Sequence, residues 1–355
     1  MALRSLFARE ARWVRHNAGV LVLVLLVLPS LFAVSTVAFQ QVIPRDTPIA
    51  VVPESDVVSE DEVDAVTGVA AFFSRPHDYD SRASAERALA REEVYALFVV
   101  PHGLFDEDAS VTIEMVVEEE MVPYEQPSLA IANILSGQLR GTFPAETTVE
   151  RTAIGEDRTL SEFLVSVGTI LLTMVYAFVY LPRVVADEQR VFQRIRVESS
   201  LWRLLTVKYA VFLPLMLVPV VAFQGIAASL DFRVDLFAPG ALAATLLTFL
   251  SLSAIALGVM FLTRFATVGR MVNATLLFGT LAFSNLVYPA GFFSPMRRTV
   301  ARLSPIHYAA IVHRGTALKG NAAALYADRY LLLGGFAVGA LAFLAGSVVV
   351  YQRRA

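Results

Sequence analysis

The stretch ALAATLLTFLSLSAIALGVMFL, Ala241–Leu262, contains no charged side chain. A helix of about 20 apolar residues crosses a hydrocarbon core of about 30 Å. Five further stretches have a similar length and composition: Ala18–Phe39, Phe163–Leu181, Leu205–Ala228, Met271–Tyr288 and Tyr330–Tyr351. The mean hydropathy of the whole chain is +0.60. These features predict an α-helical integral membrane protein with six transmembrane helices.

A polar segment, residues 41–160, separates the first apolar stretch from the other five. It holds 24 acidic and 8 basic residues, a net charge of −16. Its predicted strands are Ile49–Val52, Tyr95–Val100 and Val111–Val117, and its predicted helices are Glu60–Phe73, Ser84–Glu93 and Tyr124–Arg140. Strands that alternate with helices predict a small α/β domain. Its charge predicts that water solvates this domain.

Two segments at the N-terminus, residues 1–17 and 18–40, each allow two interpretations. Residues 1–17 fit an amphipathic helix on the cytoplasmic membrane surface, or a basic flank that only sets topology. Residues 18–40 fit a first transmembrane helix, and a cleaved signal peptide is the competing interpretation. The apolar run is longer than the usual signal-peptide core, which favours the membrane anchor.

Arginine sets the expected orientation, because cytoplasmic loops are enriched in basic residues. With six spans, the arginines of segments 4–15, 183–208, 264–270 and 353–354 all fall on one side. Both termini are therefore predicted to be cytoplasmic, with residues 41–160 outside. One group of basic residues contradicts this rule, because it lies outside: Arg297, Arg298, Arg302, Arg314, Lys319 and Arg329.

The chain lacks the usual signatures of an enzyme. It has no GxxxxGK[ST] phosphate-binding loop, no HExxH pair and no GxSxG motif, so it is expected neither to bind ATP nor to bind any cofactor itself. It has no cysteine, which excludes disulfides and thiolate metal sites. The run Glu118-Glu119-Glu120 could attract a cation, but a run of like charges is more often a solvated surface.

The segment after the second span, residues 183–205, mixes charged with apolar residues at helical spacing. Such a helix can bind a partner protein or lie on lipid, and the pattern alone does not decide between them. Its candidate contact residues are Asp187, Glu188, Arg190, Arg194, Arg196, Glu198, Trp202 and Arg203.

Several stretches together resemble the permease subunit of an ABC exporter of the type-two class, in the branch with a large extracytoplasmic domain after the first span. Ala85–Phe105 is similar to that branch's helix, strand and Pro-x-Gly-Phe turn. Asp187–Arg190 and Leu201–Lys208 resemble the coupling region, although Gln189-Arg190 stands where Gly-Thr is usual. Three stretches resemble the external re-entrant segment, here residues 289–328: Gly291–Pro295, Leu303–Ala309 and Arg314–Gly320.

This resemblance implies a division of labour between subunits. The chain would form the translocation path within a transmembrane domain, residues 161–352. Residues 183–205 would couple it to separate ATPase subunits that bind the ATP. A second permease protomer, identical or related, would complete the assembly, in contact with membrane lipid and with no nucleic acid. A re-entrant segment would also allow its arginines to lie against lipid headgroups.

Polar residues within the spans are candidates for the path: Thr169, Thr173, Tyr176, Asn273, Thr280 and Asn285. The alternative role is helix–helix packing, in which such side chains hydrogen-bond within the bundle. Two other functional classes remain open. An ion-driven secondary transporter would usually carry acidic residues inside its spans, and these spans are almost free of them. A membrane sensor would use the outer domain to bind a ligand.

Overall fold

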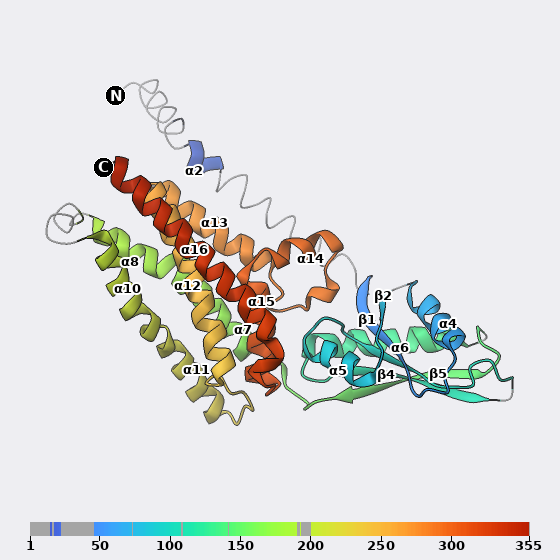
Figure 1. The fold of residues 1–355 in the computed structure, drawn as a ribbon. Helices are drawn as coiled ribbons and strands as arrows, with labels where there is room; N and C mark the ends of the chain where they lie inside the picture. Colours follow the sequence, from blue (N-terminus) through green and yellow to red (C-terminus); the bar gives the residue numbers. More distant parts are fainter. Residues whose placement is uncertain are drawn as a thin grey trace, which may run out of the picture.

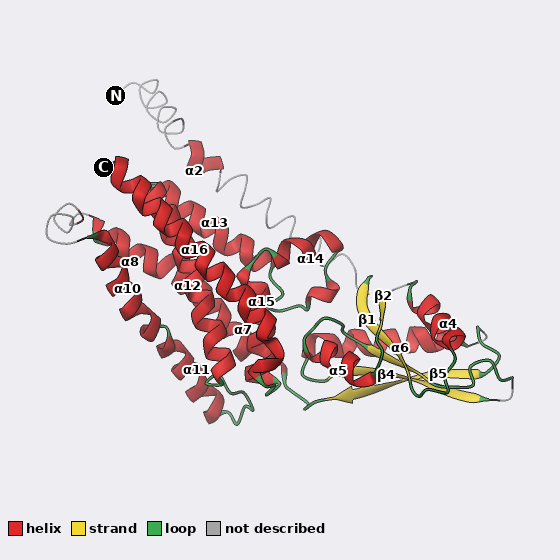
Figure 2. Ribbon diagram, in the orientation of Figure 1, coloured by secondary structure: helices red, strands yellow, loops and turns green. Residues whose placement is uncertain are grey.

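The protein consists of a group of long helices with a sheet-containing unit at one end (Figure 1). The computed structural model describes residues 15, 18–22, 46–72, 74–107, 109–140, 142–189, 192 and 200–354. We call residues 46–154 the sheet domain, and Figure 2 shows that the strands of the described chain gather there. The C-terminus lies at the opposite end of the helices, which we call the far end.

The sheet domain is built on one five-stranded sheet of order β2-β1-β3-β4-β5. Strand β1 pairs in parallel with β2 and β3, β3 pairs antiparallel with β4, and β4 pairs in parallel with β5. The strands are β1 Thr47–Pro53, β2 Ser74–Asp78, β3 Leu97–Val100, β4 Ser110–Glu118 and β5 Glu146–Ile154. The helices are α4 Glu60–Ala70, α5 Arg82–Ala90 and α6 Glu125–Leu139.

Helices cover both faces of this sheet, because its central strands are apolar on both sides. Val51 and Phe98 share one buried core with Val66 of α4 and Leu135 of α6. Alternate residues of the same strands, such as Val52 and Val99, pack with Leu89 of α5 in a second core. The sheet and the helices on its two faces form three layers.

The sequence patterns identified the central strands and missed two others. Predicted strands at Ile49–Val52, Tyr95–Val100 and Val111–Val117 correspond to β1, β3 and β4. Strand β2 reads SRPHD and β5 reads ETTVERTAI, and both are largely polar. Each pairs with a single neighbour at an edge of the sheet, where little apolar surface is buried. The chain therefore returns to the long helices through β5, and not directly from α6 as expected.

Among the described residues, four helical stretches are long and apolar enough to cross a membrane: Leu160–Asp187, Leu201–Ser229, Pro239–Leu262 and Ala323–Arg354. They contain α7 Leu160–Val175, α8 Leu181–Asp187, α10 Leu201–Leu215, α11 Leu217–Ser229, α12 Pro239–Leu262 and α16 Ala327–Arg354. A π-helical turn, Tyr176–Tyr180, joins α7 to α8. Helix α13, Thr267–Phe283, is shorter, with 17 residues.

Two of the six predicted spans take a different form in the structure, and six spans are not established, because four described helices are long and apolar enough to cross a membrane. The span expected to reach Tyr288 ends at Phe283, and Ser284 is extended. The carbonyls of Asn285 and Leu286 instead accept hydrogen bonds from Arg314. Residues Leu205–Ala228 form two helices that meet at Met216, just after Pro214. A proline inside a helix removes one hydrogen bond and clashes with the preceding turn.

The predicted re-entrant segment, residues 289–328, folds into short helical pieces at the sheet end of the bundle. They are a 3₁₀ turn Ala290–Phe292, α14 Pro295–Arg302, α15 Pro305–His313, a π-helical turn Arg314–Leu318 and a 3₁₀ turn Ala323–Tyr326. Helix α15 packs on α12 and α16. Of the first predicted span only α2, Ala18–Val22, is described; the predicted helix over residues 1–17 lies outside the described residues apart from Arg15.

Candidate functional site

The far end carries the residues that were predicted to couple to an ATPase. Asp187 ends α8, and Trp202 and Arg203 lie exposed in the first turn of α10. Glu188 forms an ion pair with Lys208 of α10, so its charge is partly used inside the chain. Four further predicted contact residues lie outside the described part of the chain: Arg190, Arg194, Arg196 and Glu198.

A cavity of about 460 Å³ opens beside this segment. Asp187 and Gln189 line it together with Arg183 and Arg270, so its polar wall includes both signs of charge. Asn273, a predicted path residue on α13, lines the same cavity. The structure therefore brings one predicted coupling residue and one predicted path residue to a common space at the far end.

Hydrogen bonds engage the polar side chains of four predicted path residues. The hydroxyls of Thr169, Thr173 and Thr280 donate to carbonyls four residues earlier in their own helices. The amide of Asn273 donates to the carbonyl of Ala256 on α12, at 3.1 Å. Of these bonds, that of Asn273 joins two helices, as in the alternative role of helix packing, whereas the threonine hydroxyls bond within their own helices.

The remaining two path candidates occupy special positions. Tyr176 begins the π-helical turn of the second span, and its ring lies 5.3 Å from that of Tyr180. Asn285 follows the end of α13 at the sheet end and is fully buried. Neither polar atom of its side chain has a hydrogen-bond partner among the described residues. A buried amide without partners is costly, so this position is unusual for packing alone.

The sheet end is dominated by a buried ion pair that sequence reasoning missed. Arg314 begins the π-helical turn after α15 and donates to both carboxylate oxygens of Glu92, at 2.9 and 2.6 Å. The two side chains are only 3% and 1% exposed. Burial alone would raise the pKa of Glu92, but the charges of Arg314 and Lys319 hold that pKa below its ordinary value. This fork-shaped pairing joins the sheet domain to the helices.

A second buried pair lies close by. Lys319, just after the π-helical turn, donates to Glu118 at the end of β4. Burial raises the pKa of Glu118 to about 7, although Lys319 counteracts the shift. The interpretation of Glu118-Glu119-Glu120 as a solvated surface is therefore wrong. Glu118 and Glu120 are buried, and Glu119 pairs with Arg151 at 2.9 Å.

Partly exposed pairs surround these two. Arg329 at the start of α16 contacts Glu93 at 3.0 Å, and Arg91 contacts Asp328 at 2.7 Å. The expected placement of the external basic residues against lipid headgroups is thus wrong for Arg314, Lys319 and Arg329, because acidic residues of the sheet domain neutralise them. The opposite charges of segments 41–160 and 289–328 were the sequence signal that could have revealed this junction.

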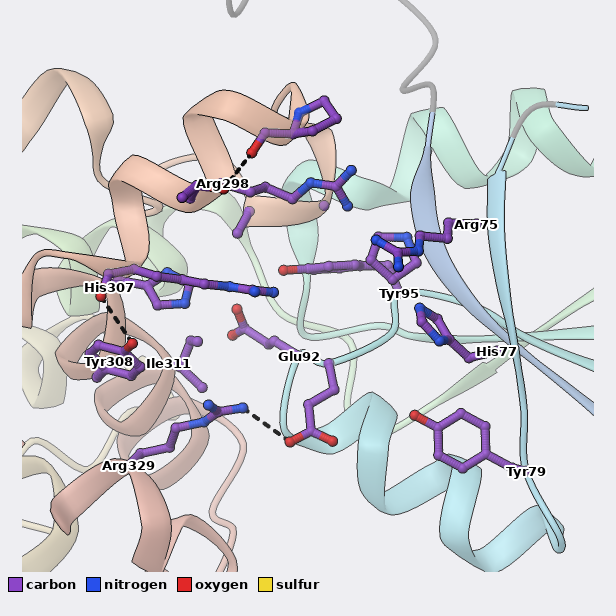
Figure 3. A pocket seen from close by; sticks show the side chains of 17 residues that line it. Arg75, His77, Tyr79, Glu92, Tyr95, Arg298, His307, Tyr308, Ile311 and Arg329 are labelled. Atoms are coloured by element: carbon purple, nitrogen blue, oxygen red, sulfur yellow. Dashed lines mark hydrogen bonds and ion pairs between the residues drawn. The ribbon is translucent and has the colours of Figure 1, made fainter. Parts of the chain in front are cut away.

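A cavity of about 630 Å³ lies within the junction. Its walls come from the sheet domain, α14, α15 and the start of α16 (Figure 3). Glu92 and His307 face one another across its deeper part in that view, and Arg75 and Arg298 lie nearer its rim. The lining combines four arginines, two histidines and two glutamates with apolar residues. Such a lining suits a polar ligand that carries negative charge.

Within the described residues, no group of three or more acidic or histidine side chains is arranged to hold a metal ion. Charge pairs mark both ends: Arg314 with Glu92 and Lys319 with Glu118 at the sheet end, and Lys208 with Glu188 at the far end.

The sequence profile of ABC-2 family transporter proteins matches residues 19–352. The chain belongs to this family and is a multi-pass membrane protein, the permease of an ABC transporter. Such permeases are membrane transport subunits that generally lack a nucleotide-binding site and generally associate with ABC ATPase subunits. Searches among curated proteins and among solved structures find no match.

Proposed function

We propose that this chain is the permease of an ATP-driven exporter, oriented with the far end in the cytoplasm and the sheet domain outside. The observation that carries this proposal is the contrast in charge between the two ends of the helices. Exposed arginines gather at the far end: Arg183, Arg203, Arg264, Arg270, Arg353 and Arg354. Unpaired basic residues are typical of cytoplasmic loops. At the sheet end, Arg314, Lys319 and Arg329 are neutralised by acidic partners, which reduces the number of basic residues that depart from the rule.

Coupling would start at residues 183–205, where an ATPase subunit docks. A movement there would pass along α7–α8 and α10–α11, since these helices begin or end in that segment. At the sheet end, α15 packs on α7, α12 and α16, and the π-helical turn that follows it is ion-paired to the sheet domain. The helices and the sheet domain would therefore move as connected rigid elements. A second permease protomer, identical or related, would complete the path, as the family resemblance implies.

The rival mechanism of an ion-driven transporter gains no support from Glu162, the acidic residue at the edge of the second span. It accepts hydrogen bonds from the backbone N–H groups of Thr159 and Arg233, at 2.8 and 2.7 Å. It caps α7 and ties that helix to the loop before α12. A carboxylate held by several donors in this way is a structural group.

The experiment is co-purification of the full-length chain with its ATPase, followed by ATP hydrolysis. The double charge swap Glu188→Lys with Lys208→Glu keeps the internal pair but reverses the surface field. We expect ATPase association to weaken by about tenfold or more, because charges across an interface fix partner and register. The matched control swaps the exposed pair Arg82 and Glu114 of the sheet domain, which contact at 2.9 Å.

Two results would contradict the proposed coupling or the proposed function. If both swaps retain equal ATPase association and equal stimulated hydrolysis, residues 183–205 are not the coupling segment. If no ATPase co-purifies with the unmodified chain, the proposal of an ATP-driven exporter fails. Reporter fusions after residue 354 and within residues 55–60 should in addition report opposite sides of the membrane.

A further inference from the structure

The cavity at the junction is lined by more arginines than its glutamates pair with. Glu92 is fully engaged by Arg314, and Glu93 is engaged by Arg329 at 3.0 Å and by Arg91 at 3.1 Å. Three other arginines of the lining have no carboxylate partner among the described residues. These are Arg75, Arg298 and Arg302.

The three guanidinium groups converge from two sides. Arg75 comes from β2 of the sheet domain, and Arg298 and Arg302 come from α14. Figure 3 shows Arg75 and Arg298 extending toward one another from opposite walls. Burial lowers the pKa of Arg298, the charge of Asp46 counteracts this shift, and the like charges of Arg302 and Arg75 lower the pKa further. Nη1 of Arg298 also donates to the backbone carbonyl of Asp46 at 2.9 Å. Charges that repel one another in a half-closed cavity are stabilised by an anion between them.

A second observation points to a ligand in the same place. His307 of α15 lines the cavity and is only 6% exposed. Its ring nitrogen Nδ1 is buried and has no hydrogen-bond partner among the described residues. A buried polar atom without a partner costs free energy unless a ligand or water satisfies it. The cavity thus offers one buried ring nitrogen in addition to the arginines.

The position of α14 indicates where the ligand comes from. Its residues Pro295, Arg298, Thr299 and Arg302 share one face of the helix and line the cavity. On a neighbouring face, Met296, Val300 and Leu303 are 65%, 36% and 73% exposed. Helix α14 lies between α13 and the sheet domain in Figure 1, at the end of the long helices. An amphipathic helix in this place suits the membrane interface, with apolar side chains in lipid and arginines beside the headgroups.

We propose that this cavity binds a phosphate ester through Arg75, Arg298 and Arg302, and that the ester is the headgroup of a membrane amphiphile whose apolar chains lie along α14. Arginine suits this role, because its planar fork matches the oxygens of a phosphate. His307 lies deeper and supplies a further contact to the headgroup. This inference concerns binding, and it stands whether or not the chain exports the amphiphile that it binds.

The test is calorimetric titration of the purified full-length chain with three probes. Dihexanoyl-phosphatidylglycerol carries the phosphate and two short apolar chains, glycerol 3-phosphate carries the phosphate alone, and dihexanoyl-phosphatidylcholine carries a phosphate without net charge. We expect the first probe to bind at least about tenfold more tightly than the other two. Equal affinity for phosphatidylglycerol and glycerol 3-phosphate would keep the anion site but make its natural ligand a soluble ester.

The decisive variant is Arg298→Gln combined with Arg302→Gln. We expect it to weaken binding of phosphatidylglycerol by about tenfold or more, since each charge-assisted hydrogen bond contributes strongly. The matched control is Arg297→Gln on the same helix. Arg297 does not line the cavity; it stacks on Phe293 at 3.7 Å and donates to the carbonyl of Ala282. Its substitution should change the affinity by less than about twofold.

Three results would overturn the proposal. These are a wild-type chain that binds no anionic probe, a double variant that binds as tightly as wild type, and an equal loss in Arg297→Gln. If the double variant does not fold, as judged by its thermal unfolding, the single change Arg75→Gln replaces it. Arg75 is exposed on an edge strand, so its loss should spare the fold while weakening anion binding.

Discussion

The two ends of the helical bundle differ in how they hold their basic residues. At the far end, residues such as Arg183, Arg270 and Arg353 are exposed. At the sheet end, Arg314 and Lys319 are almost completely buried against Glu92 and Glu118. Both ends carry basic residues, so their difference in exposure comes from the part of the chain that covers each end. An acidic domain docked on one end converts free charges into internal pairs.

This contrast matters energetically, because exposed and buried pairs differ in kind. An exposed pair contributes about 0–1 kcal/mol. A buried pair contributes little net stability, but removal of one partner leaves an uncompensated charge and costs about 3–5 kcal/mol. The sheet end is therefore sensitive to single substitutions and selective for one docking geometry, whereas the far end stays available to a partner.

The largest expected effect is that of Arg314→Gln. It should lower the free energy of unfolding by about 3–5 kcal/mol, because Glu92 is left buried and unpaired. Thermal and denaturant unfolding of the purified chain measure this loss. Arg183→Gln at the far end is the control, with a change within about 0.5 kcal/mol. Equal effects at the two ends would remove the contrast between them.

A double substitution sharpens this prediction. Arg314→Leu with Glu92→Leu removes both charges, so no buried charge remains unpaired. The double variant should be more stable than either single variant, as expected when a buried ion pair is replaced by apolar residues. A double variant that is less stable than both single variants would mean that the pair itself holds the domain in place.

A smaller effect, of about 1–3 kcal/mol, should appear in the pH dependence of stability. Burial raises the pKa of Glu118 to about 7 in the folded chain, above its unfolded value near 4.5. A carboxyl with a raised pKa stabilises the fold below pH 4.5, and this contribution is lost as the pH rises through 7. The stability of wild type relative to Glu118→Gln should therefore fall between pH 5 and pH 8.

Glu62 provides the opposite case within the same domain. Burial would raise its pKa, but hydrogen bonds from the N–H groups of Ser59, Gly103 and Leu104 outweigh burial and lower the pKa to about 2. Its contribution is present above pH 4.5 and is lost only as the pH falls toward 2. Wild type and Glu62→Gln should therefore differ by a constant amount between pH 5 and pH 8. If Glu118→Gln shows the same pH slope of stability as wild type between pH 5 and pH 8, the titration does not belong to Glu118.

The smallest effect is expected for Arg329→Gln at the rim of the junction. The side chains of Arg329 and Glu93 are 19% and 37% exposed, so water screens their attraction. The loss should be about 0–1 kcal/mol. It should also diminish in high salt, which the loss from Arg314→Gln should not. A cost as large as that of Arg314→Gln would mean that the whole junction is buried in solution.

The sequence identified the elements whose patterns are strong. Helix α12 and the helix that contains α16 follow from uninterrupted apolar runs, and β1, β3 and β4 follow from short apolar strands. It missed β2 and β5, because polar edge strands are specified by their pairing partners. It also placed the end of α13 too late, because the carbonyls of Asn285 and Leu286, just after this helix, bind Arg314, far along the chain.

The candidate sites likewise contain some residues that the sequence could identify and others that it could not. Asp187 and Trp202 could be proposed for coupling because both lie in one segment, residues 183–205, that mixes charged with apolar residues. The pair of Glu92 and Arg314 could not be proposed, because 222 positions separate the two residues. Nor could the shared cavity of Asp187 and Asn273, which belong to different helices.

The sequence by itself determined the membrane class of this protein, the acidic insertion and the family to which it belongs. These properties reside in local composition, since the transfer of each segment into lipid or water depends mainly on its own side chains. Only the tertiary structure decided which charges are free and which are neutralised. That outcome depends on distances between residues remote in sequence and on the loss of water around them, and both arise only when the sheet domain docks on the helices.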